Sequence, residues 1–423
     1  MAGVMLAISC SFRHPSACRQ RVILSGVRYD TNRRVSCLVR FCWKLAGDGR
    51  DKPGHDGDGA VLELTGWYET SAGRAPSHVI VEAKSGGPVA SRKIRIGILG
   101  AGAMGAEHAG AYAHIPDIEV VGVFARDLER ARSVADICGA QPFDDATALI
   151  QNDAVDAIDV CLPSVIHHSF VMMALSHAKH VFCETPLTLR LDEAQQMREA
   201  ARRAGRLLQV GLLMRSVAPH EHIKAVTVSG EYGNLLSLAT YRLGSYLRHG
   251  APDHKSHYSD PSTELMTFDY DFANWLLGRP VRLSAGCTKL GLHGPGEISA
   301  VLSYSDGRHA TIVASGLMPR GHPFSVGFRA LFEGALFELH NIFGSGPPQS
   351  KFTMSDDGSG LREITMRGRN PYQCELQRFV DCIRGQADPE LLDVDRAIDA
   401  LTMSVATQRS LEQARSVEIL AVR

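Results

Sequence analysis

The sequence predicts an α/β fold with a doubly wound parallel sheet, followed by a second half that is built from β-hairpins. Three observations support this prediction. A glycine-rich turn joins an apolar strand to a helix at residues 93–115, strands and helices alternate as far as residue 213, and short alternating runs with tight turns follow. Strand–helix alternation is typical of parallel sheets, whereas tight turns between alternating runs are typical of antiparallel hairpins.

Length and composition indicate a globular chain of two or three domains. The chain has 423 residues, of which 44% are hydrophobic and 22% are charged. Its 45 Lys and Arg balance 46 Asp and Glu, so we expect neither nucleic acid nor a membrane as a partner. No apolar run approaches the roughly 20 residues that a membrane-spanning helix needs. Ten cysteines without a CxxC pair favour reduced thiols in the cytoplasm and give no support for a metal site.

Residues 1–92 differ from the rest of the chain. Four of the ten cysteines lie in the first 42 residues, arginine is frequent, and GDGRDKPGHDGDG has no core-forming pattern. We expect disorder or weak local structure here. Two interpretations stay open, a transit peptide and an over-extended gene start. We favour the second because KLAGDGRDKPGHDG resembles translated intergenic repeat DNA, although no methionine between Met5 and Met104 offers a later start.

The segment KIRIGILGAGAMGAEHAGAYAHI contains a GxGxxG motif between a strand and a helix. Gly100 permits the tight turn, Gly102 lets a pyrophosphate approach the backbone, and Gly105 lets helix and strand pack closely. Ala103 and Met104 lie with them at the start of the helix, where phosphate binds. This context predicts a Rossmann-type domain that binds a dinucleotide.

The second strand, EVVGVF, indicates the preferred cofactor. It ends in Ala125, Arg126 and Asp127. An acidic residue here binds the ribose hydroxyls of NAD, whereas a small residue followed by arginine suits the 2′-phosphate of NADP. Asp127 precedes LERARSVAD and is better placed as the N-cap of that helix. We therefore expect NADP, with NAD possible; the alternatives for Arg126 are stacking on adenine and plain solvation.

Strands and helices continue to alternate further along the chain. The expected strands are VDAIDVCLPS, HVFCETP and LLQVGLL, and the expected helices between them are IHHSFVMMALSHA and DEAQQMREAARRAGR. Ligands collect at the carboxyl ends of parallel strands. Both CLPSVIHH and CETP lie at such ends.

These segments resemble the Gfo/Idh/MocA oxidoreductases, which use NAD(P) on sugars, inositols and related polyols. The similar segments are GILGAGAMGAEHAGAY, CLPSVIHHSF, VFCETPLTL, WLLGRP and NPYQCELQRFVDCIRGQ. The resemblance covers about residues 93–420. It implies a Rossmann domain over residues 93–216 and an α+β C-terminal domain over residues 217–423, with an open, largely antiparallel sheet. The exposed face of that sheet commonly makes dimers or tetramers, so we expect a homodimer or homotetramer.

The second half is supported independently by its alternating runs and turns. These runs are LLSLATYRL, VRLSAGCTKL, ISAVLSYSDGRHATIVASGL, SVGFRALFEGALFEL and FTMSDDGSGLREITM. Asp-Gly and Glu-Gly turns join several of them, which predicts a meander of hairpins. A helix-rich tail then closes the chain.

The resemblance also assigns residues to the nicotinamide edge of the cofactor site. It implies that Pro163 and His167 lie near the nicotinamide ribose and that Glu184 and Thr185 contact the ribose or nicotinamide. The alternative for His167 is a helix-start histidine that bonds to backbone. The alternative for Glu184 is a structural hydrogen bond.

Thr185 stands where the family usually has a lysine that hydrogen-bonds the substrate hydroxyl and assists its deprotonation. Threonine can orient a hydroxyl but cannot act as a cation or as a base near neutral pH. Counting back from Trp275, Glu264 and Phe268 occupy the positions of the family's aspartate and proton-accepting histidine. Of lysine, aspartate and histidine, only a carboxylate therefore remains.

A replacement for the lost proton-transfer groups is expected in APDHKSHYSDPSTELMTFDYDF. Lys255 and His257 lie just before the expected helix and are the candidates for the acid and base. The alternative is a solvated loop whose charges have no special role.

The helix after this loop has a candidate substrate face. Glu264, Phe268, Asp271 and Trp275 recur at i, i+4, i+7 and i+11, which places them on one side. We expect Glu264 and Asp271 to bind polyol hydroxyls and Phe268 to floor the pocket. Arg215 either anchors an anionic substrate or forms a structural ion pair.

These observations predict an NADP-dependent oxidoreductase that acts on a carbohydrate, polyol or related carbonyl with a substituted proton-transfer apparatus. Two alternatives stay open. One is an enzyme that retains its cofactor for transient oxidation during glycoside hydrolysis or elimination. The other is a catalytically silent nucleotide-binding sensor.

Overall fold

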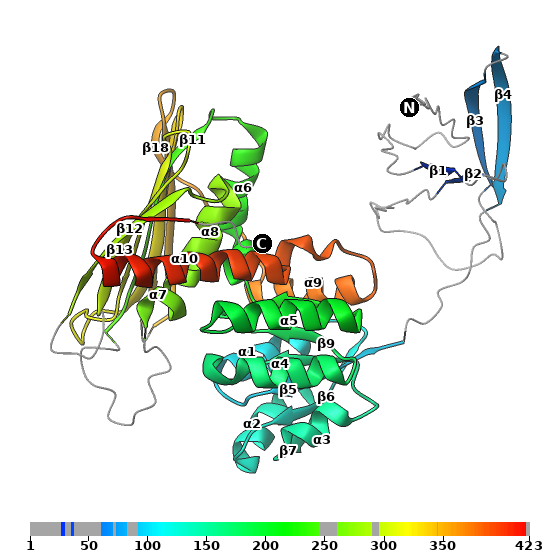
Figure 1. The fold of residues 1–423 in the computed structure, drawn as a ribbon, viewed down its shortest axis with the longest axis horizontal. Coiled ribbons are helices and arrows are strands. Elements are labelled where there is room, and N and C mark those ends of the chain that lie inside the picture. Colours follow the sequence, from blue (N-terminus) through cyan, green and yellow to red (C-terminus); the bar gives the residue numbers. More distant parts are fainter. Residues whose placement is uncertain are drawn as a thin grey trace. The chain divides into compact units, whose positions relative to one another are not determined.

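The computed structural model describes residues 27–29, 35–37, 61–70, 73–82, 92–245, 260–289, 296–344 and 346–419 (Figure 1). The chain divides into two compact units, Met1–Ser91 and Arg92–Arg423.

The first unit contains two antiparallel strand pairs. β1 (Val27–Tyr29) pairs with β2 (Val35–Cys37), and β3 (Val61–Thr70) pairs with β4 (Gly73–Glu82). An isolated two-stranded hairpin is marginally stable in water, so this pairing fits the expected weak local structure better than full disorder. The interpretation of residues 1–92 as an extension outside the fold stays a prediction.

The second unit begins with a six-stranded parallel sheet in the order β10-β9-β8-β5-β6-β7. Its strands are β5 (Ile94–Leu99), β6 (Ile118–Phe124), β7 (Gln141–Phe143), β8 (Ala157–Val160), β9 (His180–Cys183) and β10 (Leu208–Val210). The helices between them are α1 (Ala103–Tyr112), α2 (Leu128–Cys138), α3 (Ala146–Gln151), α4 (His167–Ser176) and α5 (Leu191–Ala204). The strand order reverses at β5, so the ligand crevice lies at the carboxyl ends of β5 and β8.

The ends of two helices follow directly from the sequence. Asp127 caps α2, because its carboxylate accepts hydrogen bonds from the backbone N–H groups of Glu129 and Arg130. The expected N-cap is thus confirmed. Gly205 ends α5 in the left-handed conformation with φ of 60°, which glycine adopts without steric cost.

A nine-stranded sheet forms the second half, in the order β18-β17-β16-β15-β11-β14-β13-β12-β19. Its strands are β11 (Leu235–Leu243), β12 (Arg282–Thr288), β13 (Glu297–Ser303), β14 (His309–Ser315), β15 (Phe324–Phe332), β16 (Ala335–Phe343), β17 (Gln349–Asp356), β18 (Gly360–Glu363) and β19 (Val417–Glu418). Within the described strands of this sheet, β11 and β14 are parallel and all other neighbours are antiparallel. The predicted largely antiparallel sheet is confirmed.

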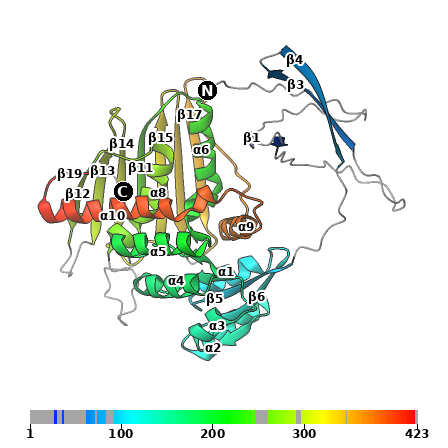
Figure 2. The same cartoon turned by 45° about the vertical axis from the view of Figure 1, so that its right-hand side comes forward.

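Helices cover one face of this sheet, as Figure 2 shows for α6, α8 and α10. These helices are α6 (Ala218–Ser229), α7 (Pro261–Glu264), α8 (Met266–Leu277), α9 (Pro371–Ile383) and α10 (Val394–Gln413). None of the helices in the described ranges is long and apolar enough to cross a membrane.

The tail of the chain returns to the first sheet. Leu376 and Phe379 of α9 and Leu401 of α10 are buried in the same hydrophobic cluster as Ile96 and Ile98 of β5. Helix α9 also packs directly against α1. The nucleotide-binding half is therefore completed by residues from the far end of the sequence.

Candidate functional site

The three glycines of the loop between β5 and α1 have different surroundings. Gly100 has φ of +119°, and a Cβ on it would lie 2.4 Å from the carbonyl oxygen of Cys161. A Cβ on Gly105 would lie 2.0 Å from the carbonyl oxygen of Gly100, whereas a Cβ on Gly102 would meet nothing within 4 Å. Gly100 and Gly105 are therefore needed for close packing, and the space beside Gly102 fits an approaching pyrophosphate.

The N-terminus of α1 faces this space. The helix begins at Ala103, and no side chain in the described part of the chain caps it at Gly102. The first N–H groups of a helix lack intrahelical partners, so those of Ala103 and Met104 suit a phosphate oxygen. The loop thus fits the cofactor that its sequence predicts.

Two charged side chains, Arg126 and Asp127, follow the end of β6 and have different surroundings. Arg126 is exposed directly beyond the strand. Asp127 is also exposed, but its Oδ1 lies 3.0 Å from the backbone nitrogen of Glu129 in α2. The Asp127 carboxylate is therefore engaged by the helix, and Arg126 is an exposed cation at the end of β6.

His167 begins α4 and is 1% exposed. Its Nε2 lies 2.6 Å from the carbonyl oxygen of Leu162, and its Nδ1 lies 3.0 Å from that of Pro186. Burial lowers the pKa of the imidazole. These contacts link the loops after β8 and β9. They favour the alternative in which His167 bonds to backbone. Pro163 is exposed just before the 3-10 turn Ser164–Ile166.

Thr185 and Glu184 form a turn after β9. The Thr185 hydroxyl donates a hydrogen bond to the Gly211 carbonyl oxygen at 2.7 Å, and the Thr185 N–H donates to Oε2 of Glu184 at 3.0 Å. Glu184 is 8% exposed, and its Oε1 lies 2.8 Å from Nε2 of His108. The Glu184 carboxylate therefore faces the interior, which favours its structural alternative.

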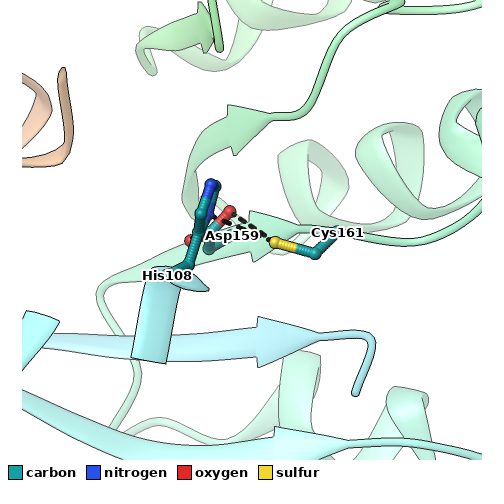
Figure 3. A group of neighbouring side chains, drawn as sticks. All are labelled: His108, Asp159 and Cys161. Atoms are coloured by element: carbon teal, nitrogen blue, oxygen red, sulfur yellow. Dashed lines mark hydrogen bonds and ion pairs between the residues drawn. The ribbon is translucent and has the colours of Figure 1, made fainter. Parts of the chain in front are cut away.

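His108, which contacts Glu184, belongs to a group of buried polar side chains with Asp159 and Cys161 (Figure 3). His108 of α1 and Asp159 of β8 are both 0% exposed, and His108 Nδ1 lies 2.8 Å from Asp159 Oδ2. Cys161 Sγ lies 3.2 Å from the same nitrogen. Burial lowers the pKa of His108, but Asp159 and Cys161 together more than offset burial, so this pKa is raised well above its usual value.

Glu375 of α9 belongs to the same interior. It is 0% exposed, and both burial and the neighbouring Glu184 raise the pKa of its carboxyl well above the usual value. Sequence reasoning missed His108, Asp159 and Glu375. The available signal was Asp159, a carboxylate within the otherwise apolar strand AIDVCL, because aspartate is rarely fully buried without a partner.

Glu264 connects the two halves of the second unit. It ends α7, is 5% exposed, and accepts a hydrogen bond of 2.8 Å from the hydroxyl of Ser164, beyond the end of β8. Burial raises the pKa of Glu264 to about 7. A carboxyl group with a pKa near neutrality can both accept and return a proton.

The prediction of one continuous helix from Glu264 to Trp275 is wrong. Helix α7 ends at Glu264 and α8 begins at Met266, with Leu265 between them. The expected common face therefore does not run through both helices.

Asp271 is tied to Arg215 instead of facing open space. Asp271 is 1% exposed, and its two carboxylate oxygens accept hydrogen bonds from Arg215 at 2.8 and 2.7 Å. Both oxygens are engaged by Arg215, and the expectation that Asp271 also binds polyol hydroxyls stays a prediction. This pairing favours the structural alternative for Arg215.

The Phe268 ring packs against the guanidinium of Arg242, a residue that the sequence did not identify as part of the site. The guanidinium carbon of Arg242, on β11, lies 4.6 Å from the centroid of the Phe268 ring. Arg242 is 6% exposed, and its Nε donates to Asp269 Oδ2 at 2.6 Å. Lys255 and His257 lie outside the described residues, so their roles stay predictions.

Comparison with known proteins relates the nucleotide-binding segment to a family. Residues 94–212 match the Gfo/Idh/MocA model described as "Oxidoreductase family, NAD-binding Rossmann fold". The scyllo-inositol 2-dehydrogenase (NAD(+)) of Bacillus subtilis is 26% identical over 342 residues, which are 77% of this chain and 96% of that protein. The D-xylose 1-dehydrogenase (NADP(+)) 2 of Haloferax volcanii is 27% identical over 330 residues, 75% of this chain and 98% of that protein.

The solved structure of a levoglucosan dehydrogenase in complex with NADH has the same fold. It aligns with a TM-score of 0.68 at 16% identity and covers 78% of this chain and 100% of its own. The predicted two-part architecture is thereby confirmed. The glycine loop lies inside the segment that matches this family's NAD-binding domain, and the chain is similar along nearly the whole length of relatives named as inositol and xylose dehydrogenases.

Proposed function

We propose that this protein is a dehydrogenase of a sugar, polyol or related carbonyl compound, in which Glu264 exchanges the proton of the reacting hydroxyl. The observation that carries this proposal is the buried contact between Glu264 and Ser164. Ser164 lies three residues beyond Cys161, the residue whose carbonyl oxygen packs against Gly100 of the nucleotide loop. The named inositol and xylose dehydrogenases among the relatives support the substrate class.

Oxidation of a CH–OH group requires acceptors for a hydride and for a proton. A bound nicotinamide supplies the hydride acceptor. The Glu264 carboxylate takes the hydroxyl proton while the Ser164 hydroxyl holds Oε1 in place, and the protonated Glu264 returns the proton in carbonyl reduction. A pKa of about 7 makes both forms available near neutrality. Lys255 and His257 remain proposed as further acid and base groups.

NADP is the proposed cofactor, and Arg126 is its proposed 2′-phosphate ligand. The Asp127 carboxylate caps helix α2, and this supports the preference because a carboxylate used as a cap is less suited to bind the ribose hydroxyls of NAD. We expect Arg126→Ala to weaken NADP binding roughly 10- to 100-fold, since a charge-assisted contact is lost, and to change NAD binding less than about twofold.

Fluorescence titration of both cofactors tests this expectation. Arg203→Ala removes an exposed arginine of α5 and serves as the matched control. Equal losses of NADP and NAD affinity in Arg126→Ala would remove the 2′-phosphate assignment.

Turnover with NADP or NADPH and a panel of polyols, sugars and carbonyl compounds tests the function as a whole. The silent sensor is the second candidate, because the Thr185 hydroxyl is bound to Gly211 and Phe268 replaces a histidine. Cofactor binding without turnover in either wild type or Glu264→Gln would favour the sensor. Nicotinamide retained through gel filtration would favour the enzyme that works by transient oxidation.

A further inference from the structure

Three residues of the polar interior are arranged as metal ligands. His108 of α1, Glu184 at the end of β9 and Glu375 of α9 each offer one ligand atom, and these atoms all lie within 4.8 Å of one another. The residues are 0%, 8% and 0% exposed, respectively. We propose that they bind a divalent transition-metal cation that fastens helix α9 to the nucleotide-binding half.

The contacts among these residues are not hydrogen bonds. His108 Nε2 and Glu184 Oε1 are 2.8 Å apart, yet Nε2 has no hydrogen-bond partner among the described residues. We therefore treat this contact as a short approach and not as a hydrogen-bonded ion pair. Ligand atoms around a cation point at a common centre and not at each other, which accounts for such an approach.

Glu375 supplies an independent indication of a missing partner. Both of its carboxylate oxygens are buried and lack a hydrogen-bond partner within the described part of the chain. An unpaired buried carboxylate is costly, because it has lost its hydration without compensation. A cation between Glu375, Glu184 and His108 compensates both carboxylates with two positive charges.

The remaining nitrogen of His108 has the environment that metal-binding histidines require. Nδ1 lies 2.8 Å from Asp159 Oδ2 in a buried hydrogen bond (Figure 3). A ligating histidine almost always donates its other ring N–H to such a carboxylate or carbonyl, which fixes the ring and its tautomer. With Nδ1–H donated to Asp159, Nε2 is the ring nitrogen that faces Glu184 Oε1 at 2.8 Å, and a cation would bind there in place of the Nε2 proton.

The alternative group of His108, Asp159 and Cys161 is less suited to a cation. Its members already hydrogen-bond to one another, with Cys161 Sγ 3.2 Å from His108 Nδ1 and 3.5 Å from Asp159 Oδ1. One imidazole and two carboxylates match the donor preferences of Mn²⁺, Fe²⁺ and Zn²⁺. The expectation of no metal rested on the absence of a short cysteine motif, whereas these ligands come from three separate elements.

Metal content tests the proposal. The untagged full chain is incubated with Zn²⁺ or Mn²⁺, desalted and analysed by plasma mass spectrometry. We expect about one cation per wild-type chain and a loss of roughly tenfold or more in Glu375→Gln, which keeps the side-chain shape. Glu107→Gln, an exposed neighbour on α1, should bind as wild type does.

Thermal unfolding gives a second readout that needs no variant. A chelator should lower the Tm of wild type by about 5 °C, because binding energy of the cation contributes to folding, and readdition should restore it. If Glu375→Gln does not fold, this wild-type titration decides alone. Wild type with far less than one cation and an unchanged Tm overturns the proposal. Equal metal retention in Glu375→Gln also overturns it, since the ligands then lie elsewhere.

Discussion

The two neighbouring helices α7 and α8 hold buried carboxylates in opposite electrostatic settings. Asp271 and Asp269 of α8 each face a buried guanidinium, from Arg215 and Arg242. Glu264 of α7 has only the Ser164 hydroxyl as its hydrogen-bond donor among the described contacts. Buried Glu264 has no cationic partner in the described ranges and can therefore take up a proton near neutral pH. The buried aspartates of α8 instead form ion pairs with arginine. The interaction partner of a buried carboxylate, and not its position along a helix, determines whether it can exchange a proton or forms a structural ion pair.

The largest effect is expected from Glu264→Gln. We expect kcat to fall about 100- to 10,000-fold, because glutamine retains the shape but cannot exchange a proton. Wild-type alcohol oxidation should rise with pH through about 7, as the accepting carboxylate forms, and carbonyl reduction should fall over the same range. Initial rates in both directions across pH measure this dependence.

The variant Ser164→Ala gives a second test of Glu264, through the position of the pH profiles. The Ser164 hydrogen bond lowers the pKa of Glu264 against the effect of burial, so its removal should move both pH profiles upward. Profiles that stay flat through this range in wild type would exclude Glu264 as the proton-exchanging group.

The next effect is expected from Asp271→Asn, which should destabilise the fold by about 3–5 kcal/mol. Arg215 would remain buried at 4% side-chain exposure without its ionic partner. Denaturant unfolding measures the loss, and kcat per folded molecule should stay within about twofold of wild type. The double variant Arg215→Met with Asp271→Leu should recover much of the stability, since no charge is left unpaired. A tenfold loss of kcat at unchanged stability would return Asp271 to the substrate site.

The smallest effect is expected from Phe268→Leu, at about 1–2 kcal/mol of stability. This change removes the ring beneath Arg242 while Asp269 still pairs with the guanidinium. Chemical unfolding again measures it, with KM for the substrate determined in parallel. A raised KM at unchanged stability would instead support Phe268 as the floor of the substrate pocket.

The features that the sequence predicts well are those with a local cause. The glycine spacing, the Asp127 cap and the hairpin turns each depend on a few consecutive residues, and each is found where expected. The contacts between Arg242 and Asp269 or between His108 and Glu375 join residues far apart in the chain, and no periodicity encodes them. The break at Leu265 also escaped prediction, because the helical pattern of apolar residues continues through it.

The return of α9 and α10 to the first sheet has a consequence for synthesis in the cell. A ribosome releases the glycine loop and its strands early, but Leu376, Phe379 and Leu401, which share their hydrophobic cluster, emerge only near the end. Until then the apolar surface that these side chains cover stays open to solvent and to chaperones. A chain that stops before α9 and α10 would keep that surface exposed, so the nucleotide-binding half acquires its complete core only after these two helices have been synthesised.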